Sequence, residues 1–100
     1  MIEIKNLRNQ KPLYDWDVKV DRSSILGNPF HMYKEIERES VCNNYAEYFQ
    51  EQMLNNSKFI AEILRLRQLY QTHGKLNLFC WCTPKRCHAE TIKNEILKSL

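Results

Sequence analysis

The feature that most constrains the fold is a short apolar run at residues 76–82. The run lies between Gly74 and Pro84 and is mostly apolar, and it is too short for a full helix. Such a run is typical of a central strand that is buried on both faces, as in a parallel sheet covered by helices. The sequence therefore predicts a buried strand here, with other elements packed around it.

Two further strands are predicted near the N-terminus. Ile2 and Ile4 alternate with polar residues, and the same period of two runs from Tyr14 to Val20, as in half-buried strands. The polar segment between the two runs contains Pro12 and is typical of a loop.

From about residue 34 the apolar period becomes helical, and three helices are predicted. The first has Ser40 as its N-cap and an apolar stripe of Val41, Tyr45, Tyr48, Phe49 and Met53. The second starts at a Ser57 cap and ends at Gly74, with a stripe of Ile60, Ile63, Leu64 and Tyr70. The third starts near Arg86 or Cys87, with a stripe of Ala89, Ile92, Ile96, Leu97 and Leu100.

This order of elements predicts one α/β domain over residues 1–100, with a small mixed or parallel three-stranded sheet and about three helices. The chain has 43% hydrophobic and 27% charged residues, which is ordinary for a globular domain. It contains no run of 18 apolar residues, and its first residues do not resemble a signal peptide, so a cytoplasmic location with reduced cysteines is expected. The net charge of +3 is too mild to favour nucleic acid as a partner.

The predicted topology brings two polar loops together. If the strands that end near Asp21 and Cys82 are parallel, their C-terminal ends lie at the same edge of the sheet. Ligands bind at that edge in open α/β sheets. The segments that follow the two strands are therefore expected to form one site.

The first of these segments, at residues 21–30, carries candidate ligand-binding residues. Arg22 could bind a phosphate or carboxylate with two parallel hydrogen bonds, and Ser24 and Asn28 could add further hydrogen bonds. Gly27 precedes Asn28, which is followed by Pro29, and this order indicates a tight turn that can require a positive φ at Gly27.

The second segment concentrates sulfur and imidazole donors, because Cys80, Cys82, Cys87 and His88 lie within nine positions. One interpretation makes these four residues zinc or iron–sulfur ligands. The other makes Cys82, Cys87 and His88 catalytic residues at the start of the last helix, where the helix dipole attracts anions and lowers the pKa of a thiol. Cys80 taken alone, and Cys42, also fit small buried core residues.

Both segments together resemble a known family. The runs Arg22-Ser23-Ser24-x-x-Gly27-Asn28-Pro29-Phe30 and Cys80-Trp81-Cys82-x-Pro84-x-x-Cys87-His88 are similar to domain of unknown function 4326, a family of bacterial, archaeal and phage proteins. The resemblance covers nearly the whole chain and implies a phage or bacterial cytoplasmic protein. It implies no activity.

The preferred hypothesis is a site that binds, and could process, an anionic or nucleotide-like small molecule. Its predicted residues are Arg22, Ser24, Asn28, Cys82, Cys87 and His88. The alternative is a zinc-stabilised module that binds a host protein or nucleic acid through a helix face.

Overall fold

The central strand is β3 (Leu76–Cys80), as the apolar run predicts. The computed structural model describes residues 1–98, and in it β3 pairs in parallel with β1 (Ile2–Asn6) on one side and β2 (Asp17–Lys19) on the other. Leu78 lies opposite Ile4 in one pair and opposite Val18 in the other. The three-stranded parallel sheet is therefore one of the two predicted forms.

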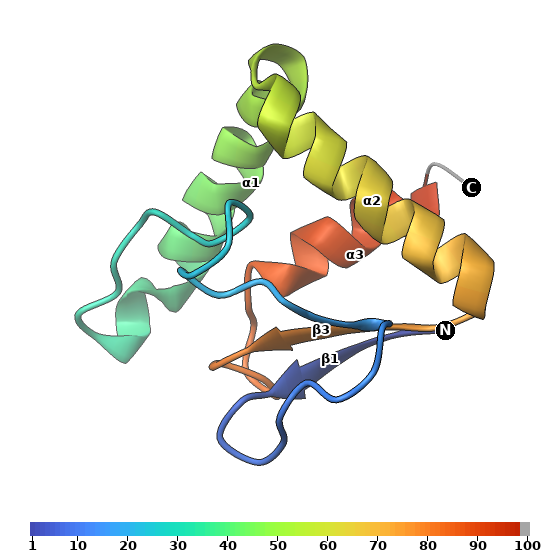
Figure 1. Cartoon of the computed structure of the whole chain (residues 1–100). Coiled ribbons are helices and arrows are strands. Elements are labelled where there is room, and N and C mark those ends of the chain that lie inside the picture. Colours follow the sequence, from blue (N-terminus) through green and yellow to red (C-terminus); the bar gives the residue numbers. More distant parts are fainter. Residues whose placement is uncertain (99–100) are drawn as a thin grey trace.

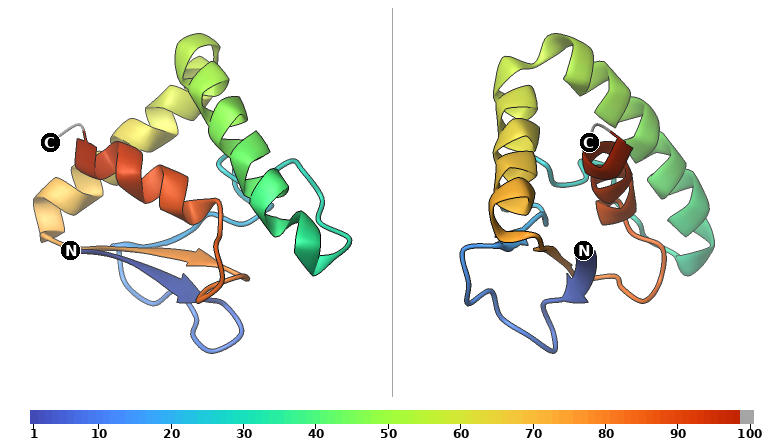
Figure 2. Two further views of the ribbon diagram at one scale, coloured as in Figure 1. Left: turned by 180° about the vertical axis from the view of Figure 1, so that it is seen from behind. Right: turned by 90° about the vertical axis from the view of Figure 1, so that its right-hand side faces the viewer.

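Four helical segments follow the order of the chain. They are a 3-10 turn, η1 (Glu35–Glu37), and three α-helices, α1 (Arg38–Asn55), α2 (Ser57–His73) and α3 (Ala89–Lys98). The three α-helices lie on one side of the sheet, and the loop between β1 and β2 lies on the other side (Figures 1 and 2). The result is the predicted α/β class with one shared core.

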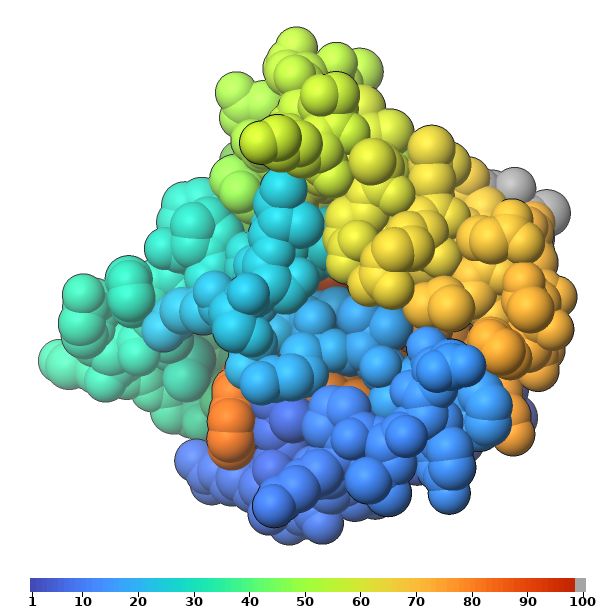
Figure 3. Space-filling model, in the orientation of Figure 1, coloured from blue at the N-terminus to red at the C-terminus, as the bar shows by residue number. Residues whose placement is uncertain are grey.

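The core lies between the sheet and the helices. Every second residue of β3 faces the helices, so Leu76, Leu78 and Cys80 join one buried cluster with residues of all three helices. The helices contribute Tyr45 and Phe49 from α1, Phe59, Ile63 and Leu66 from α2, and Ala89, Ile92 and Ile96 from α3. The segment after β2 runs over the surface between the sheet and the helical hairpin (Figure 3, light blue to cyan).

The strands are shorter than predicted. β2 begins only at Asp17. Tyr14 lies before the strand, where it is 58% exposed and stacks on Trp16 at a ring distance of 4.8 Å. β3 ends at Cys80 rather than Cys82. Its neighbours supply no strand partner beyond Asn6 and Lys19, so the following residues leave the sheet as a loop.

The helix ends also differ from the predictions. Residue 37 rather than Ser40 precedes α1, and Asn56 rather than Ser57 caps α2. The left-handed cap at Gly74 is confirmed, with a φ of 72°. Leu64 and Leu97 are 51% and 41% exposed, so they lie outside the core; Leu100 lies outside the described residues.

A single substitution tests the cap of α2. The side-chain oxygen of Asn56 accepts hydrogen bonds from the backbone N–H groups of Lys58 and Phe59, at 3.1 and 3.2 Å. Asn56→Ala is therefore expected to lower the free energy of unfolding by about 1 kcal/mol, measured by urea denaturation. The control is Ser57→Ala, which should lower the free energy of unfolding far less. An equal loss in the two variants would contradict the assignment of Asn56 as the cap.

None of the helices within residues 1–98 has the length and hydropathy that a bilayer span requires.

Candidate functional site

A cavity of about 430 Å³ opens at the C-terminal edge of the sheet. Three parts of the chain line it: the segment after β2, the first turns of α1 and the segment after β3. Its lining residues are Asp21, Arg22, Ser23, Asn28, Phe30, Met32, Arg38, Val41, Cys42, Trp81, Cys82, Arg86, Cys87 and His88.

The two predicted segments do converge on this cavity. Arg22 and Asn28 come from the segment after β2, and Cys82, Cys87 and His88 come from the segment after β3. They meet because β2 and β3 are parallel neighbours, so both chain segments leave the sheet at the same edge.

Ser24 does not line the cavity with them. Its Oγ accepts a hydrogen bond from the N–H of Leu26 at 3.0 Å, within its own turn, and its neighbour Ser23 lines the cavity instead. Cys80 also lies outside the lining, because it is only 1% exposed and belongs to the core.

The turn at residues 21–30 depends on close backbone packing. A Cβ on Gly27 would lie 2.5 Å from the carbonyl oxygen of Asp21 and 2.7 Å from the Cα of Arg22. The expected positive φ at Gly27 is wrong, since in the described chain only Gly74 has one. Gly27 is needed here for space, not for backbone freedom.

Arg22 holds this turn from the cavity side. Its Nε donates to the carbonyl oxygen of Asn28 and its Nη2 to that of Phe30, both at 3.2 Å. Asn28 adds a bond within the turn, because its Oδ1 accepts from the N–H of Phe30 at 2.9 Å. Arg22 lines the cavity, so the delocalised positive charge of its guanidinium lies at the cavity wall.

Three thiols beside the cavity ionise in dependence on one another. Interaction with Cys87 and, against the opposing effect of burial, with Arg38 lowers the pKa of Cys82 to about 5. Interaction with Cys87 also lowers the pKa of Cys80, to about 6. Cys82 has the lower pKa and is the most exposed of the three, so the negative charge is assigned to Cys82.

The expectation of a lowered pKa at Cys87 is therefore wrong. Hydrogen bonding to Cys80 and Cys82, together with burial, raises the pKa of Cys87. The residue is 3% exposed and keeps its proton, while the negative charge resides on its neighbour.

His88 is a fixed, neutral side chain. Its Nε2 lies 2.5 Å from the carbonyl oxygen of Val20, and its ring meets that of Tyr45 edge-on at 5.0 Å. Burial lowers the pKa of His88. Because a carbonyl only accepts, Nε2 carries the proton, and Nδ1 turns a lone pair toward the Sγ of Cys87 at 3.4 Å.

The start of α3 differs from the one that the anion hypothesis assumed. The helix begins at Ala89, two residues later than Cys87. The N–H of Cys87 donates to Glu90 Oε2 at 3.1 Å, and the N–H groups of Glu90 and Thr91 donate to the carbonyl oxygens of Cys87 and His88. These three amides are therefore already paired and are not open to an anion.

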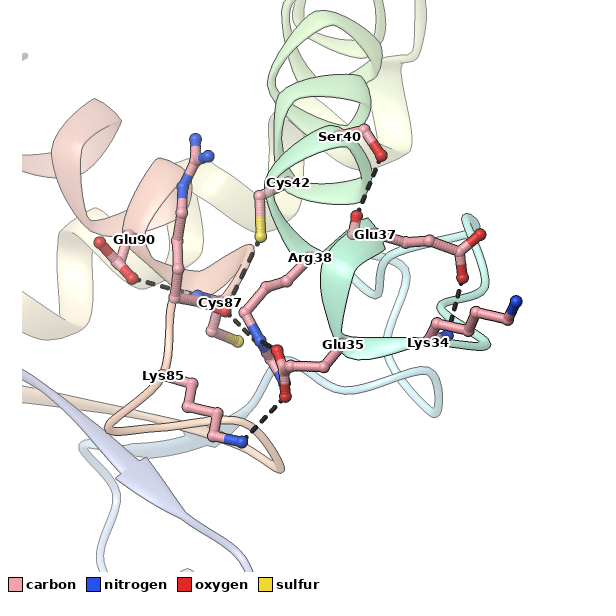
Figure 4. Close-up of polar contacts among 10 residues, drawn as sticks. Lys34, Glu35, Glu37, Arg38, Ser40, Cys42, Lys85, Cys87 and Glu90 are labelled. Carbon is pink, nitrogen blue, oxygen red and sulfur yellow. Dashed lines mark hydrogen bonds and ion pairs between the residues drawn. The ribbon is translucent and has the colours of Figure 1, made fainter.

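Arg38 is the most important residue that the sequence analysis missed. Its Nη1 donates to the carbonyl oxygen of Arg86 at 3.0 Å, and its guanidinium pairs with Glu35. It lines the cavity with Cys82 and lowers the pKa of that thiol. Lys85 approaches the same Glu35 carboxylate at 2.8 Å (Figure 4). Arg38 and Lys85 lower the pKa of Glu35 to about 2.

The sequence held a weak signal for this arrangement. Arg38 is the one basic residue among Glu35, Glu37 and Glu39, a run that by default forms a solvated helix face. Glu39 in turn pairs with Arg86 at 2.5 Å. Glu35 in η1 and Glu39 in α1 thus orient two of the cavity arginines, Arg38 and Arg86.

A metal site at Cys80, Cys82, Cys87 and His88 stays an untested hypothesis. Both ring nitrogens of His88 already face partners, Val20 and Cys87. Among residues 1–98, no group of three or more Cys, His, Asp or Glu side chains has the geometry of a metal site. Zinc ligation here would have to use Nδ1, with the N–H of Nε2 still donated to the carbonyl oxygen of Val20.

The ionisation of Cys82 is testable by alkylation. Since only the thiolate reacts, the rate at Cys82 is expected to be half-maximal near pH 5 and flat above neutrality. Cys42, whose pKa is raised by burial, should react only in alkaline solution. Peptide mass spectrometry after iodoacetamide pulses gives both profiles; a Cys82 rate still rising above neutral pH would contradict the assignment.

A comparison with known protein families confirms the resemblance that the two motifs indicated. A family model described as "Domain of unknown function (DUF4326)" matches residues 4–98. The chain belongs to this family. The match spans every residue that lines the cavity of this DUF4326 protein. No curated protein and no solved structure matches the chain.

Proposed function

We propose that this DUF4326 domain binds an anionic, nucleotide-like small molecule in the cavity and holds the Cys82 thiolate beside it. The observation that carries the proposal is the charge of Arg22. Within residues 1–98 no carboxylate forms an ion pair with the guanidinium of Arg22. This guanidinium donates hydrogen bonds to backbone carbonyl oxygens. A cation without a counter-ion at a cavity wall favours an anionic ligand.

The rest of the lining supports the same ligand class. Two further arginines of the lining, Arg38 and Arg86, are paired with Glu35 and Glu39. The carboxylate within the lining, Asp21, already accepts from Ser23 and from Nε1 of Trp81, so it does not neutralise Arg22. The indole of Trp81 and the ring of Phe30 offer apolar faces for a base or another flat group. A volume near 430 Å³ is within the usual range for small-molecule sites.

The cellular setting belongs to the proposal as well. A thiolate at Cys82 stays reactive only where thiols are kept reduced, which is the cytoplasm. No protein or nucleic-acid partner is needed for this function.

Trp81 provides the test, because it lines the cavity while the second tryptophan, Trp16, lies outside it. In a Trp16→Phe background, adenosine monophosphate is expected to change Trp81 fluorescence and to raise the melting temperature. Inorganic phosphate should act more weakly, and adenosine should not bind measurably.

Arg22→Lys is expected to weaken binding about tenfold, because the planar fork is lost. Arg8→Lys, in the exposed loop after β1, is the matched control and should bind as the parent does. Absence of any response to nucleotides, phosphate or carboxylates would overturn the proposal. A stoichiometric zinc signal that survives dialysis would replace it with the zinc-stabilised module.

A further inference from the structure

The thiols at the cavity allow a chemistry that ligand binding does not require. Cys82 and Cys87 both line the cavity, and the pKa of each thiol depends on the other. The four residues between them form a tight loop, closed by the bond from the N–H of Lys85 to the carbonyl oxygen of Cys82 at 3.0 Å. Two cysteines that face one cavity from the ends of so short a closed loop need little backbone movement to join.

The two sulfurs are not equivalent. Cys82 is partly exposed at the cavity, whereas Cys87 is 3% exposed behind it. Arg38 lines the same cavity and lowers the pKa of Cys82. Its positive charge therefore stabilises the thiolate and the negative charge on the leaving oxygen of a peroxide. An oxidant that enters the cavity therefore meets Cys82 first.

Cys87 has a base of its own. The proton on Nε2 of His88 is held by the Val20 carbonyl, which leaves Nδ1 as an acceptor 3.4 Å from the Sγ of Cys87. The imidazole can take the thiol proton when the sulfur attacks. Cys87 is therefore suited to act second, as a resolving thiol.

We propose that Cys82 and Cys87 form a peroxide-reactive dithiol, in which hydrogen peroxide or an organic hydroperoxide oxidises the pair to an intramolecular disulfide. This reactivity is separate from the proposed ligand binding and does not rest on it.

The atoms and electrons of the reaction balance. The Cys82 thiolate attacks one peroxide oxygen, the O–O bond breaks, and the departing oxygen leaves as an alcohol or water after taking a proton from solvent. His88 then accepts the proton of Cys87, whose sulfur attacks Cys82. The S–S bond forms, the S–O bond breaks, and the hydroxide takes the proton from His88 and leaves as water.

Cys80 is the competing partner, because its pKa is also lowered by Cys87. It is 1% exposed in the core and does not line the cavity, so peroxide cannot reach it without opening the fold. The proposal requires a Cys82–Cys87 bond and not a Cys80–Cys87 bond.

The test treats the fully reduced, full-length protein with one equivalent of hydrogen peroxide at neutral pH. The expected product is a monomer lighter by two hydrogen masses, whose peptide map shows a Cys82–Cys87 disulfide that dithiothreitol reverses. Cys82→Ala should slow oxidation by about tenfold or more. Cys87→Ala should stop at a sulfenic acid that dimedone traps at Cys82.

Cys80→Ala is the matched variant and should still form the bond. Peptide mapping of the unsubstituted protein decides the question even if a variant fails to fold. A Cys80–Cys87 bond, a bond between two molecules, or no fast oxidation of Cys82 would each overturn the proposal.

Discussion

Gly27→Ala is expected to disrupt the cavity and to lower the free energy of unfolding by about 1–3 kcal/mol. The added methyl group would meet backbone atoms of Asp21 and Arg22 at 2.5 and 2.7 Å. Backbone cannot move aside as a flexible side chain can, so the turn must open. Arg22 would then lose its two carbonyl acceptors on residues 28 and 30. Thermal denaturation and the Trp81 fluorescence titration measure the two effects.

The control for this prediction is Gly74→Ala. Nothing lies within 4 Å of a Cβ at Gly74, but its φ is 72°, so the cost there is conformational, about 1–2 kcal/mol. Gly74 follows α2 and does not line the cavity, and its variant should keep the parent's response to anions. If Gly27→Ala also kept that response, the packed turn would not be what shapes the cavity.

Phe59→Ala is expected to be the most destabilising of the truncations, lowering the free energy of unfolding by about 3–5 kcal/mol. Phe59 is fully buried, and its ring meets Phe49 at 5.3 Å and Tyr48 at 6.2 Å, edge-on in both cases. These contacts join α2 to α1. The loss is large enough to unfold much of a domain of this size at room temperature.

Leu54→Ala is the matched truncation for comparison. Leu54 is on the same hairpin but is 81% exposed, so its loss should change stability by less than about 0.5 kcal/mol. Urea denaturation of both variants gives the difference. Similar midpoints would mean that the interface between α1 and α2 contributes little to stability.

The fold could be predicted from the sequence where burial leaves a pattern. The apolar residues of β3 must be covered on both faces, and this requirement alone indicates a central strand with helices. Parallel pairing of β2 and β3 then places Arg22 and Cys82 at one edge. The convergence of the two loops was predictable because it depends on topology and not on side-chain detail.

Element ends were less predictable because they depend on single hydrogen bonds. Asn56 and Ser57 are both good N-cap residues, and only the backbone position decides between them. Tyr14 and Trp16 continue the period of two outside β2, since they stack on one another and Lys75 lies 4.2 Å over the indole ring. Their spacing reflects that stack and not a strand.

The chemistry of the site was the least predictable part. The spacing of Cys82 and Cys87 shows that the two thiols can meet, but it does not show which one is ionised. That depends on Arg38, which comes from α1. The carboxylate that orients Arg38, Glu35, looks like any solvated side chain in the sequence. Contacts between distant segments that involve exposed charges leave no periodic pattern.

The strand order has a consequence for how the chain matures during translation. Within residues 1–98, β1 and β2 each pair only with β3. Ile2 therefore cannot pair until Leu76 has been made, and Asp17 cannot pair until Asn77 has been made. While the ribosome makes the first 75 residues, only the hairpin of α1 and α2 has its partner available. The two N-terminal strands emerge with open edges, which favours slow folding and association with other chains. The sheet can therefore begin to form only after the residues of β3 have been synthesised.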